Sequence, residues 1–131
     1  MNETTDIPGP RHFRARHRLS HARDYQAVFE SRVRVTRGPL TLLGRPNDLP
    51  HCRLGLSIGR RFGRAHDRVR LKRMLREAFR LQASEWSPGY DLVVTARRHR
   101  SLPLSEYEKI LGSAWAEIDR RWRQRGEGGG P

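Results

Sequence analysis

The sequence predicts an α+β fold, a single-domain α/β sandwich with the element order α-β-β-β-α-β-α. Two kinds of hydrophobic pattern lead to this expectation. Three segments repeat apolar residues every three to four positions, as helices do, and four shorter segments alternate or run continuously apolar, as strands do. The chain has 131 residues, a length that suits one domain with a modest core. We therefore expect helices packed on a small, largely antiparallel sheet.

The first helix is expected over residues 21–30. Ser20 precedes this segment and is a suitable N-cap residue. Within the segment, Ala22, Tyr25, Val28 and Phe29 recur at helical spacing and form one apolar stripe. The pattern predicts an amphipathic helix that lays this stripe on the rest of the domain.

Four segments are expected to be strands. Residues 33–36 and 40–44 flank Gly38-Pro39, which reads as the turn of a hairpin. In residues 53–59, leucine and isoleucine alternate with small residues, as in a strand with one buried face. Residues 92–96 are almost continuously apolar, which is typical of a strand buried on both faces.

The second and third helices are expected over residues 67–82 and from Ser105 to about Arg123. Ser105 and Glu108 have the spacing of a capping box at the start of the third helix. A single apolar stripe continues along that helix, formed by Tyr107, Ile110, Leu111, Ala114, Trp115, Ile118 and Trp122. We expect this stripe, with both tryptophans, to belong to the core.

The charge balance indicates a polyanionic partner. The chain has 27 Lys+Arg against 14 Asp+Glu, a formal net charge of +13. Such an excess destabilises the compact state by self-repulsion, so it is usually maintained for a function. Nucleic acid is the commonest polyanion that a basic protein binds, and arginine suits it because its planar fork matches phosphate and base edges.

Other protein classes are disfavoured by the composition. Cys52 is the one cysteine, which excludes an intramolecular disulfide and a zinc site built on paired cysteines. The N-terminal segment has no apolar core of signal-peptide length, and no apolar run approaches the roughly 20 residues of a membrane span. We expect a cytoplasmic protein without a membrane association. Residues 1–17 are expected to be a flexible basic arm, residues 18–124 the folded domain, and residues 125–131 a disordered tail.

The second helix carries an unusually basic face. On a helical wheel its apolar residues occupy one arc of roughly 160°, formed by Leu71, Met74, Leu75, Ala78, Phe79 and Leu81. The remaining surface is dominated by cations, whereas solvated helix faces normally mix charges of both signs. We call the following set the basic face and expect it to bind phosphates: Arg60, Arg61, Arg64, Arg68, Val69, Arg70, Lys72, Arg73 and Arg76.

Val69 is the exception within the basic face. It falls at about 100° from Arg68 on the wheel, in the middle of the cationic arc. No core can cover a residue in that position, where a polar side chain would be the default. The pattern predicts an exposed valine among arginines.

Residues 53–79, RLGLSIGRRFGRAHDRVRLKRMLREAF, resemble the signature region of the protein subunit of bacterial ribonuclease P. That family has an Arg-Asn-Arg motif followed by a Lys-Arg pair and an Arg-Glu pair. The matching positions here are Arg68, Arg70, Lys72, Arg73, Arg76 and Glu77. DYQAVF at residues 24–29 resembles the family's first helix, and DLVVTARR at residues 91–98 resembles its last strand. Val69 departs from the pattern, because it occupies the position of the family's asparagine and offers RNA neither a donor nor an acceptor.

The resemblance implies both a fold and a function. The family fold is an α/β sandwich with a left-handed βαβ crossover. Its large RNA subunit holds the Mg²⁺ ions and is the catalyst, while the protein has no metal of its own. The protein binds that RNA through the signature helix, here the basic face, and needs no obligate protein partner. It also contacts the 5′ leader of precursor tRNA between the first helix and the sheet, which implies that Tyr25 and Phe29 stack on leader nucleotides. The holoenzyme removes the leader endonucleolytically.

Two other functions compete with this one. A self-sufficient nuclease would need clustered carboxylates for metal ions or an acid–base pair, but the acids Asp24, Glu30, Asp48, Glu85, Asp91 and Glu106 form no tight motif. A basic DNA- or RNA-binding regulator with no role in processing is the alternative, since a basic helix can enter a major groove. The absence of Asn and Gln from the basic face disfavours specific base readout.

Overall fold

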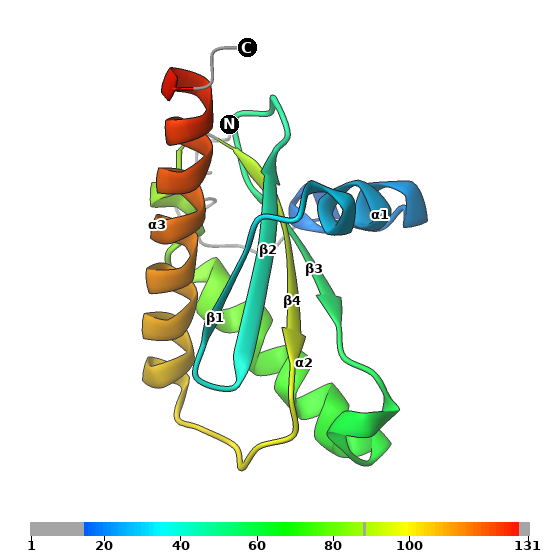
Figure 1. Ribbon diagram of the computed structural model, residues 1–131. Coiled ribbons are helices and arrows are strands. Elements are labelled where there is room, and N and C mark those ends of the chain that lie inside the picture. Colours follow the sequence, from blue (N-terminus) through cyan, green and yellow to red (C-terminus); the bar gives the residue numbers. More distant parts are fainter. Residues whose placement is uncertain (1–14, 88, 129–131) are drawn as a thin grey trace, which may run out of the picture.

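The centre of the structure is a four-stranded mixed sheet with the strand order β1-β2-β4-β3 (Figure 1). The computed structural model describes residues 15–87 and 89–128. The helices are α1 (Ala22–Ser31), α2 (Ala65–Arg80) and α3 (Leu104–Gly128), and the strands are β1 (Arg34–Arg37), β2 (Leu40–Pro46), β3 (Arg53–Ser57) and β4 (Tyr90–Ala96). Single 3-10 turns are η2 (Ala15–His17), η3 (Arg60–Phe62) and η4 (Ala83–Glu85). The predicted order of helices and strands is confirmed.

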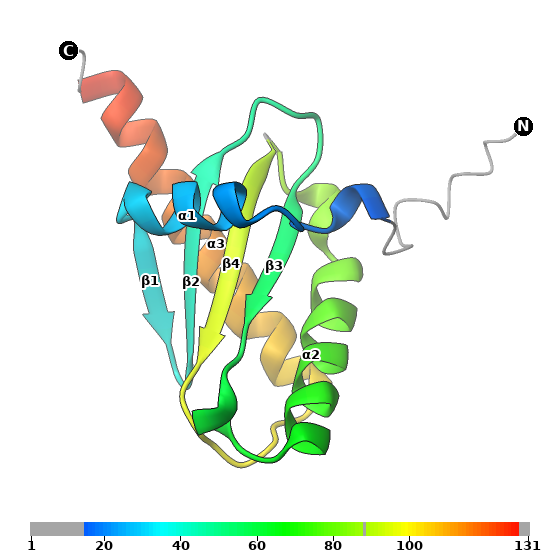
Figure 2. The same cartoon turned by 90° about the vertical axis from the view of Figure 1, so that its right-hand side faces the viewer.

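The strand pairing joins a hairpin to a crossover. β1 and β2 form the expected antiparallel hairpin, β2 pairs antiparallel with β4, and β3 pairs parallel with β4. The connection from β3 to β4 passes through α2. In Figure 2, α1 crosses the front of the sheet, and α2 lies on the side of the sheet away from α1. β3 and β4 both run downward, and β4 lies to the left of β3. The crossover is therefore left-handed, as the family resemblance implied and against the usual right-handed rule.

Apolar residues are buried on both faces of the sheet. The larger cluster joins the sheet to α2 and α3 and includes Leu75, Phe79, Leu92, Leu111 and Ile118. The smaller cluster lies under α1 and consists of Leu19, Val28, Leu43 and Val93, with Tyr25 packed against it. Two clusters explain why β4 is almost continuously apolar, because its side chains alternate between the two cores.

Two predicted helix caps are wrong. α1 begins at Ala22, and His21 is its N-cap residue, with a carbonyl that accepts from the N–H groups of Asp24 and Tyr25. Ser20 therefore lies one residue too early to cap. α3 begins at Leu104, where the carbonyl of Pro103 accepts from the N–H groups of Glu106 and Tyr107. Because the carbonyl of Pro103 already accepts the first bonds of the helix, Ser105 lies inside the first turn, and the expected capping box does not form.

The predicted ends of the domain need correction. Ala15–His17 form a 3-10 turn, so the last three residues of the expected flexible arm are ordered; residues 1–14 lie outside the described residues. At the other end α3 continues to Gly128, through the first part of the expected disordered tail. A long helix that is already packed gains one hydrogen bond per added residue, and no proline intervenes. Residues 129–131 lie outside the described residues.

No helix in the described part of the chain combines the length and the hydropathy that a membrane crossing requires.

Candidate nucleic-acid interface

The basic face lies along α2 and the preceding turn η3. Arg60 and Arg61 are exposed in η3, and Arg64 is the N-cap residue of α2. Further along, Arg70 and Arg73 are exposed, whereas Arg68, Lys72 and Arg76 are half-buried. Within residues 15–87 and 89–128, no ion pair joins any cation of this face to a carboxylate. The face thus keeps its positive charge available for phosphates.

Val69 lies on the surface, as predicted. Its side chain is 54% exposed, one of the most exposed large apolar residues described. The helix phase that places it among the cations is therefore correct. The apolar arc is also confirmed, since Leu71, Leu75, Ala78 and Phe79 are buried.

Two arginines near the ends of α2 have intramolecular partners. Arg68 donates from Nη1 to the carbonyl oxygen of Gly63 at 2.6 Å and so fixes the loop before the helix. Arg80 donates from Nε to Oε1 of Glu77 at 2.9 Å and forms an ion pair with the same carboxylate. These bonds lower the pKa of Glu77. Arg80, although on the cationic arc, is thus partly neutralised.

Tyr25 reaches the basic face across the edge of the sheet. Its hydroxyl accepts a hydrogen bond from the N–H of Leu56 at 3.2 Å, and its ring lies on Gly55 in β3. A hollow of about 220 Å³ opens beside the ring. The hollow is lined by Arg18, Leu19, Tyr25, Leu54, Leu56, Lys72 and Arg76. An aromatic ring beside two cations of α2 is the combination that binds single-stranded nucleic acid.

Phe29 lies apart from Tyr25, although both belong to α1. Phe29 is 41% exposed and lines a different hollow of about 320 Å³, together with Arg32, Arg34 and Leu43. The two rings are four residues apart and so lie on one side of α1, but different strands of the sheet lie beneath them. Tyr25 lies towards β3 and α2, whereas Phe29 lies beside the hairpin strands. The structure therefore does not bring the two predicted leader contacts into one hollow.

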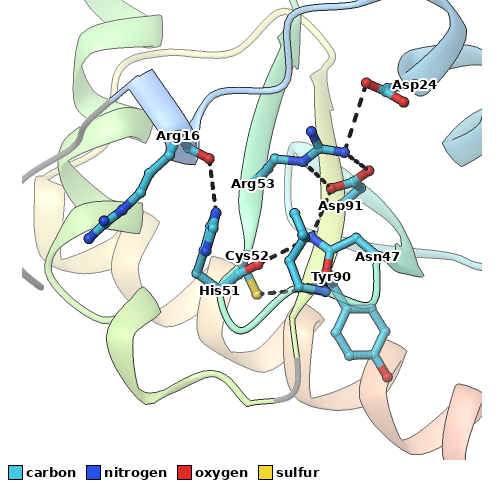
Figure 3. A network of polar contacts seen from close by, with 9 residues as sticks. Arg16, Asp24, Asn47, His51, Cys52, Arg53, Tyr90 and Asp91 are labelled. Atoms are coloured by element: carbon cyan, nitrogen blue, oxygen red, sulfur yellow. Dashed lines mark hydrogen bonds and ion pairs between the residues drawn. The ribbon is translucent and has the colours of Figure 1, made fainter.

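A polar network holds α1 over the sheet (Figure 3). Asp91, buried in β4, accepts from Nε and Nη2 of Arg53 in β3, each at 2.7 Å, and from Nδ2 of Asn47 at 2.9 Å. Arg53 also forms an ion pair with Asp24 of α1 at 3.8 Å. Hydrogen bonding to Asp91 raises the pKa of Arg53. The network joins α1, β3, β4 and the loop after β2, and thereby fixes the helix that carries Tyr25.

The same loop contacts the ordered end of the N-terminal arm. Nε2 of His51 lies 3.1 Å from the carbonyl oxygen of Arg16 (Figure 3). The rings of His51 and His17 meet edge to face, with 5.4 Å between their centroids. The nearby Cys52 is 2% exposed, and burial raises the pKa of its thiol to about 12. The loop after β2 is therefore held by the N-terminal segment through His51 and by β4 through Asn47.

Sequence reasoning missed several cations that the fold brings to these hollows. Arg18 joins the hollow of Tyr25, and Arg32 and Arg34 join that of Phe29. Arg98 and Arg100 lie near the start of α2, on the loop after β4. The run Arg97-Arg98-His99-Arg100 was a visible signal, because four basic residues in succession suit a polyanion contact. Arg32 and Arg34 lie close together just after α1, whereas Arg18 belongs to a separate segment, and no local pattern groups it with Lys72 and Arg76.

Comparisons with known proteins agree with this arrangement. The family model described as Ribonuclease P matches residues 13–119. The chain is 39% identical over 99 residues to the ribonuclease P protein component of Photorhabdus laumondii, covering 75% of this chain and 83% of that protein.

Solved structures show the same fold. The ribonuclease P protein of Thermotoga maritima, in complex with 1-(4-fluorophenyl)-2-thiourea, superposes with a TM-score of 0.66 at 31% identity, covering 73% of this chain and 94% of that chain. A mutant ribonuclease P protein of Staphylococcus aureus, described as defective in mRNA degradation, has a TM-score of 0.70 at 23% identity, over 79% and 89% of the two chains. With a matching family model over most of its length, a close relative and the family fold, the chain belongs to the ribonuclease P protein family.

Proposed function

We propose that this chain is the protein subunit that binds the catalytic RNA of ribonuclease P through the basic face and the 5′ leader of precursor tRNA through α1. The holoenzyme would then cut the precursor endonucleolytically to give the mature 5′ end. The observation that carries the proposal is the basic face itself, a row of cations on α2 and η3 that no described carboxylate neutralises. Such a row suits the phosphates of a folded RNA.

The proposal assigns the chemistry to the RNA. Among the described residues, no group of three or more His, Cys, Asp or Glu side chains is placed to hold a metal ion. Asp91, the buried carboxylate of the sheet, is saturated by Arg53 and Asn47. On this proposal the Mg²⁺ ions that activate water are held by the RNA, and the protein contributes binding and positioning.

Reconstitution tests the proposal directly. The purified protein, freed of RNA, is assayed on precursor tRNA alone and with a bacterial ribonuclease P RNA at low Mg²⁺. We expect no cleavage by the protein, weak cleavage by the RNA, and efficient cleavage at the mature 5′ end by the two together. Specific cleavage by RNA-free protein, or no effect of the protein on the RNA reaction, would overturn the proposal.

The leader contact has its own test within the reconstituted holoenzyme. Phe29→Ala removes an exposed ring and should weaken binding of leader-bearing precursor by roughly tenfold, the value of one base stack, while mature tRNA is unaffected. Leu49→Ala is the control, since Leu49 is similarly exposed but lies on the loop after β2. Equal effects of Phe29→Ala on precursor and mature tRNA would show that α1 does not contact the leader.

A further inference from the structure

A further hollow lies on the flank of α2 that faces away from Tyr25. It has a volume of about 570 Å³ and lies between η3, the first turns of α2 and the loop that joins β4 to α3. These segments meet at one end of the molecule in both views (Figures 1 and 2). Its lining consists of Phe62, Gly63, Arg64, Asp67, Arg70, Leu71, Arg98, His99, Arg100, Ser101 and Tyr107. A hollow of this size falls in the range of sites that hold one small ligand.

The rim and the floor of this hollow differ in chemistry. Arg64, Arg70, Arg98 and Arg100 are exposed, and no described carboxylate forms an ion pair with any of them. The floor is aromatic and apolar, with Phe62 and His99 in edge contact at 5.4 Å between ring centroids. Cations around an aromatic floor suit a ligand that is anionic at its edge and flat in its centre.

The aromatic floor is held in place without a ligand. Nδ1 of His99 lies 2.9 Å from the carbonyl oxygen of Arg97, and Nε2 lies 2.7 Å from the hydroxyl of Tyr107. That hydroxyl also accepts from the N–H of Leu102 at 3.2 Å. The loop itself is anchored where the N–H of Arg97 donates to the carbonyl of Pro39. A pre-formed floor lowers the entropic cost of binding.

We propose that this hollow takes one unpaired RNA nucleotide, with its base over Phe62 and His99 and its flanking phosphates at the arginine rim. This inference rests on the proposed function and adds to it a second surface of α2. A duplex presents phosphates but no free base face, so the floor would have no role in duplex binding. The nucleotide comes from the RNA subunit or from the precursor tRNA, and the experiment below separates these sources.

Asp67 adds a condition on how the nucleotide lies. It is the one carboxylate among the described residues that line the hollow, and its Oδ1 is 3.3 Å from Nε2 of His66. A carboxylate repels phosphate and accepts hydrogen bonds. The phosphates are therefore directed to the loop side of the rim, at Arg98 and Arg100, and the base edge to the side of Asp67.

A photoreactive probe at Ser101 tests whether RNA enters the hollow. Ser101 is exposed in the lining, and Ser101→Cys introduces a reactive thiol, whereas Cys52 is buried with a strongly raised pKa. The labelled protein is bound to the RNA subunit alone and then to the RNA subunit with precursor tRNA, and cross-linked nucleotides are mapped by primer extension. Ser84→Cys, exposed on η4, is the control. We expect a discrete cross-link from Ser101 at nucleotides that 2′-hydroxyl acylation shows to be unpaired.

A double variant tests the rim. Arg98→Ala with Arg100→Ala should weaken RNA binding about tenfold, lower the salt slope by about two and, when combined with Ser101→Cys, abolish the cross-link from that position. Arg45→Ala with Arg125→Ala removes the same charge from β2 and from the far end of α3, at exposed arginines for which no ion pair with a described carboxylate is recorded, and should have little effect. Circular dichroism confirms folding of both variants.

The results separate this inference from the proposed function. A cross-link to the RNA subunit or to the precursor supports the inference and identifies the source. If the parent protein supports cleavage but Ser101 yields no cross-link, or one confined to paired nucleotides, the inference is overturned while the proposed function stands. Equal losses in the two double variants also overturn it, because they would reflect net charge alone. A protein that fails to support cleavage overturns the proposed function.

Discussion

Arg53 is the residue that connects α1 to the sheet. Its guanidinium is bidentate to Asp91 and lies 3.8 Å from Asp24, so one side chain joins three elements. The side chain of Asp91 is 7% exposed and that of Arg53 is 24% exposed. A carboxylate this buried needs its partner, because an unpaired buried charge is costly. In the sequence alone, Asp91 is one of several scattered acids, with nothing local to mark its pairing with Arg53.

We predict that Asp91→Asn destabilises the protein by about 2–3 kcal/mol, below the usual cost of breaking a fully buried pair because water reaches part of Arg53. Arg53→Lys should cost about 1–2 kcal/mol, since lysine cannot form the bidentate contact. Urea denaturation measures both. The control is Arg45→Lys, at an exposed arginine that lies opposite Asp91 in the neighbouring strand. If Arg53→Lys and Arg45→Lys changed the free energy of unfolding equally, the bidentate geometry of Arg53 would be unimportant for stability.

Gly55 makes room for the ring of Tyr25. A Cβ at this position would lie 2.7 Å from Cζ of Tyr25, closer than real contacts allow, whereas a Cβ at Gly59 would meet nothing within 4 Å. We predict that Gly55→Ala costs about 1–3 kcal/mol through overpacking and weakens precursor binding by displacing Tyr25. Gly59→Ala should be neutral or slightly stabilising. Thermal melts of the two variants provide the comparison, and similar melting temperatures would contradict this account of Gly55.

Val69 is a departure from the family pattern that the structure leaves open to solvent. Because its side chain is 54% exposed, Val69→Asn should change the free energy of unfolding by less than about 0.5 kcal/mol. RNA affinity should stay level or rise, since asparagine supplies a donor and an acceptor among the arginines. Paired measurements of melting temperature and RNA affinity test this. A fall in affinity would indicate that RNA contacts the valine methyl groups.

At the scale of the element, α2 combines a buried apolar stripe with cations that are not equally free to bind RNA phosphates. Arg73 is exposed, and the structure records no ion pair for it with a described carboxylate, whereas Arg80 is bound by Glu77. We predict that Arg73→Ala lowers the slope of log affinity for the RNA subunit against log salt by about one. Arg80→Ala should lower it less, because its charge is already partly compensated. Titrations from about 50 to about 200 mM salt distinguish them, and equal slopes would mean that RNA displaces the Glu77 pair.

Periodicity predicted the elements well, because a helix or strand that is buried on one face has its apolar residues at regular spacing in the sequence. The stripes of α2 and α3 and the alternation in β3 are examples. Helix ends were less predictable. Ser20 and Ser105 had the right chemistry, but Pro103 and the backbone contact of Leu19 with Leu54 set where α3 and α1 begin. Which residue caps a helix is thus decided by how the preceding chain is held.

The candidate site was only partly predictable for a similar reason. The basic face lies on one helix, so a wheel could group its members. The two hollows beside it combine Arg18 with Lys72 and Arg76, and Arg98 with Arg64 and Arg70, residues far apart in the sequence that only tertiary packing brings together. Tyr25 and Phe29 show the opposite case. Their spacing suggested one shared surface, but different strands beneath them give each its own neighbours.

At the scale of the molecule, the strand order could not be derived from local patterns. β3 and β4 are neighbours in the sheet although α2 separates them, and β4 inserts between β3 and β2. The left-handed connection is contrary to the usual preference, so the family resemblance, and not the residue pattern, supplied it. This topology has a functional consequence, because it places α2 at the edge of the sheet with α1 near one flank and the loop after β4 near the other.

The net charge of +13 gives the whole molecule two opposite responses to salt. Without RNA, the excess of cations repels itself, and salt screens this repulsion over a Debye length of about 10 Å at 0.1 M. We predict that raising NaCl from about 20 to about 200 mM stabilises the free protein by about 1–2 kcal/mol, or roughly 3–8 °C in melting temperature. Over the same range RNA affinity should fall by orders of magnitude, because the counterions displaced on binding gain less entropy when they enter a more concentrated salt solution.

Calorimetry of the free protein and binding titrations in matched buffers measure the two trends. The ion pairs of α3, in which Glu117 contacts Arg120 and Arg121, act against the first trend, since salt weakens them. Exposed pairs of this kind contribute little to stability, too little to outweigh an excess of 13 charges. A melting temperature that falls with salt would show that paired surface charges, and not the unpaired arginines, dominate the electrostatics of the folded chain. Repulsion among the cations of the basic face would then not be a major cost to the stability of the free protein.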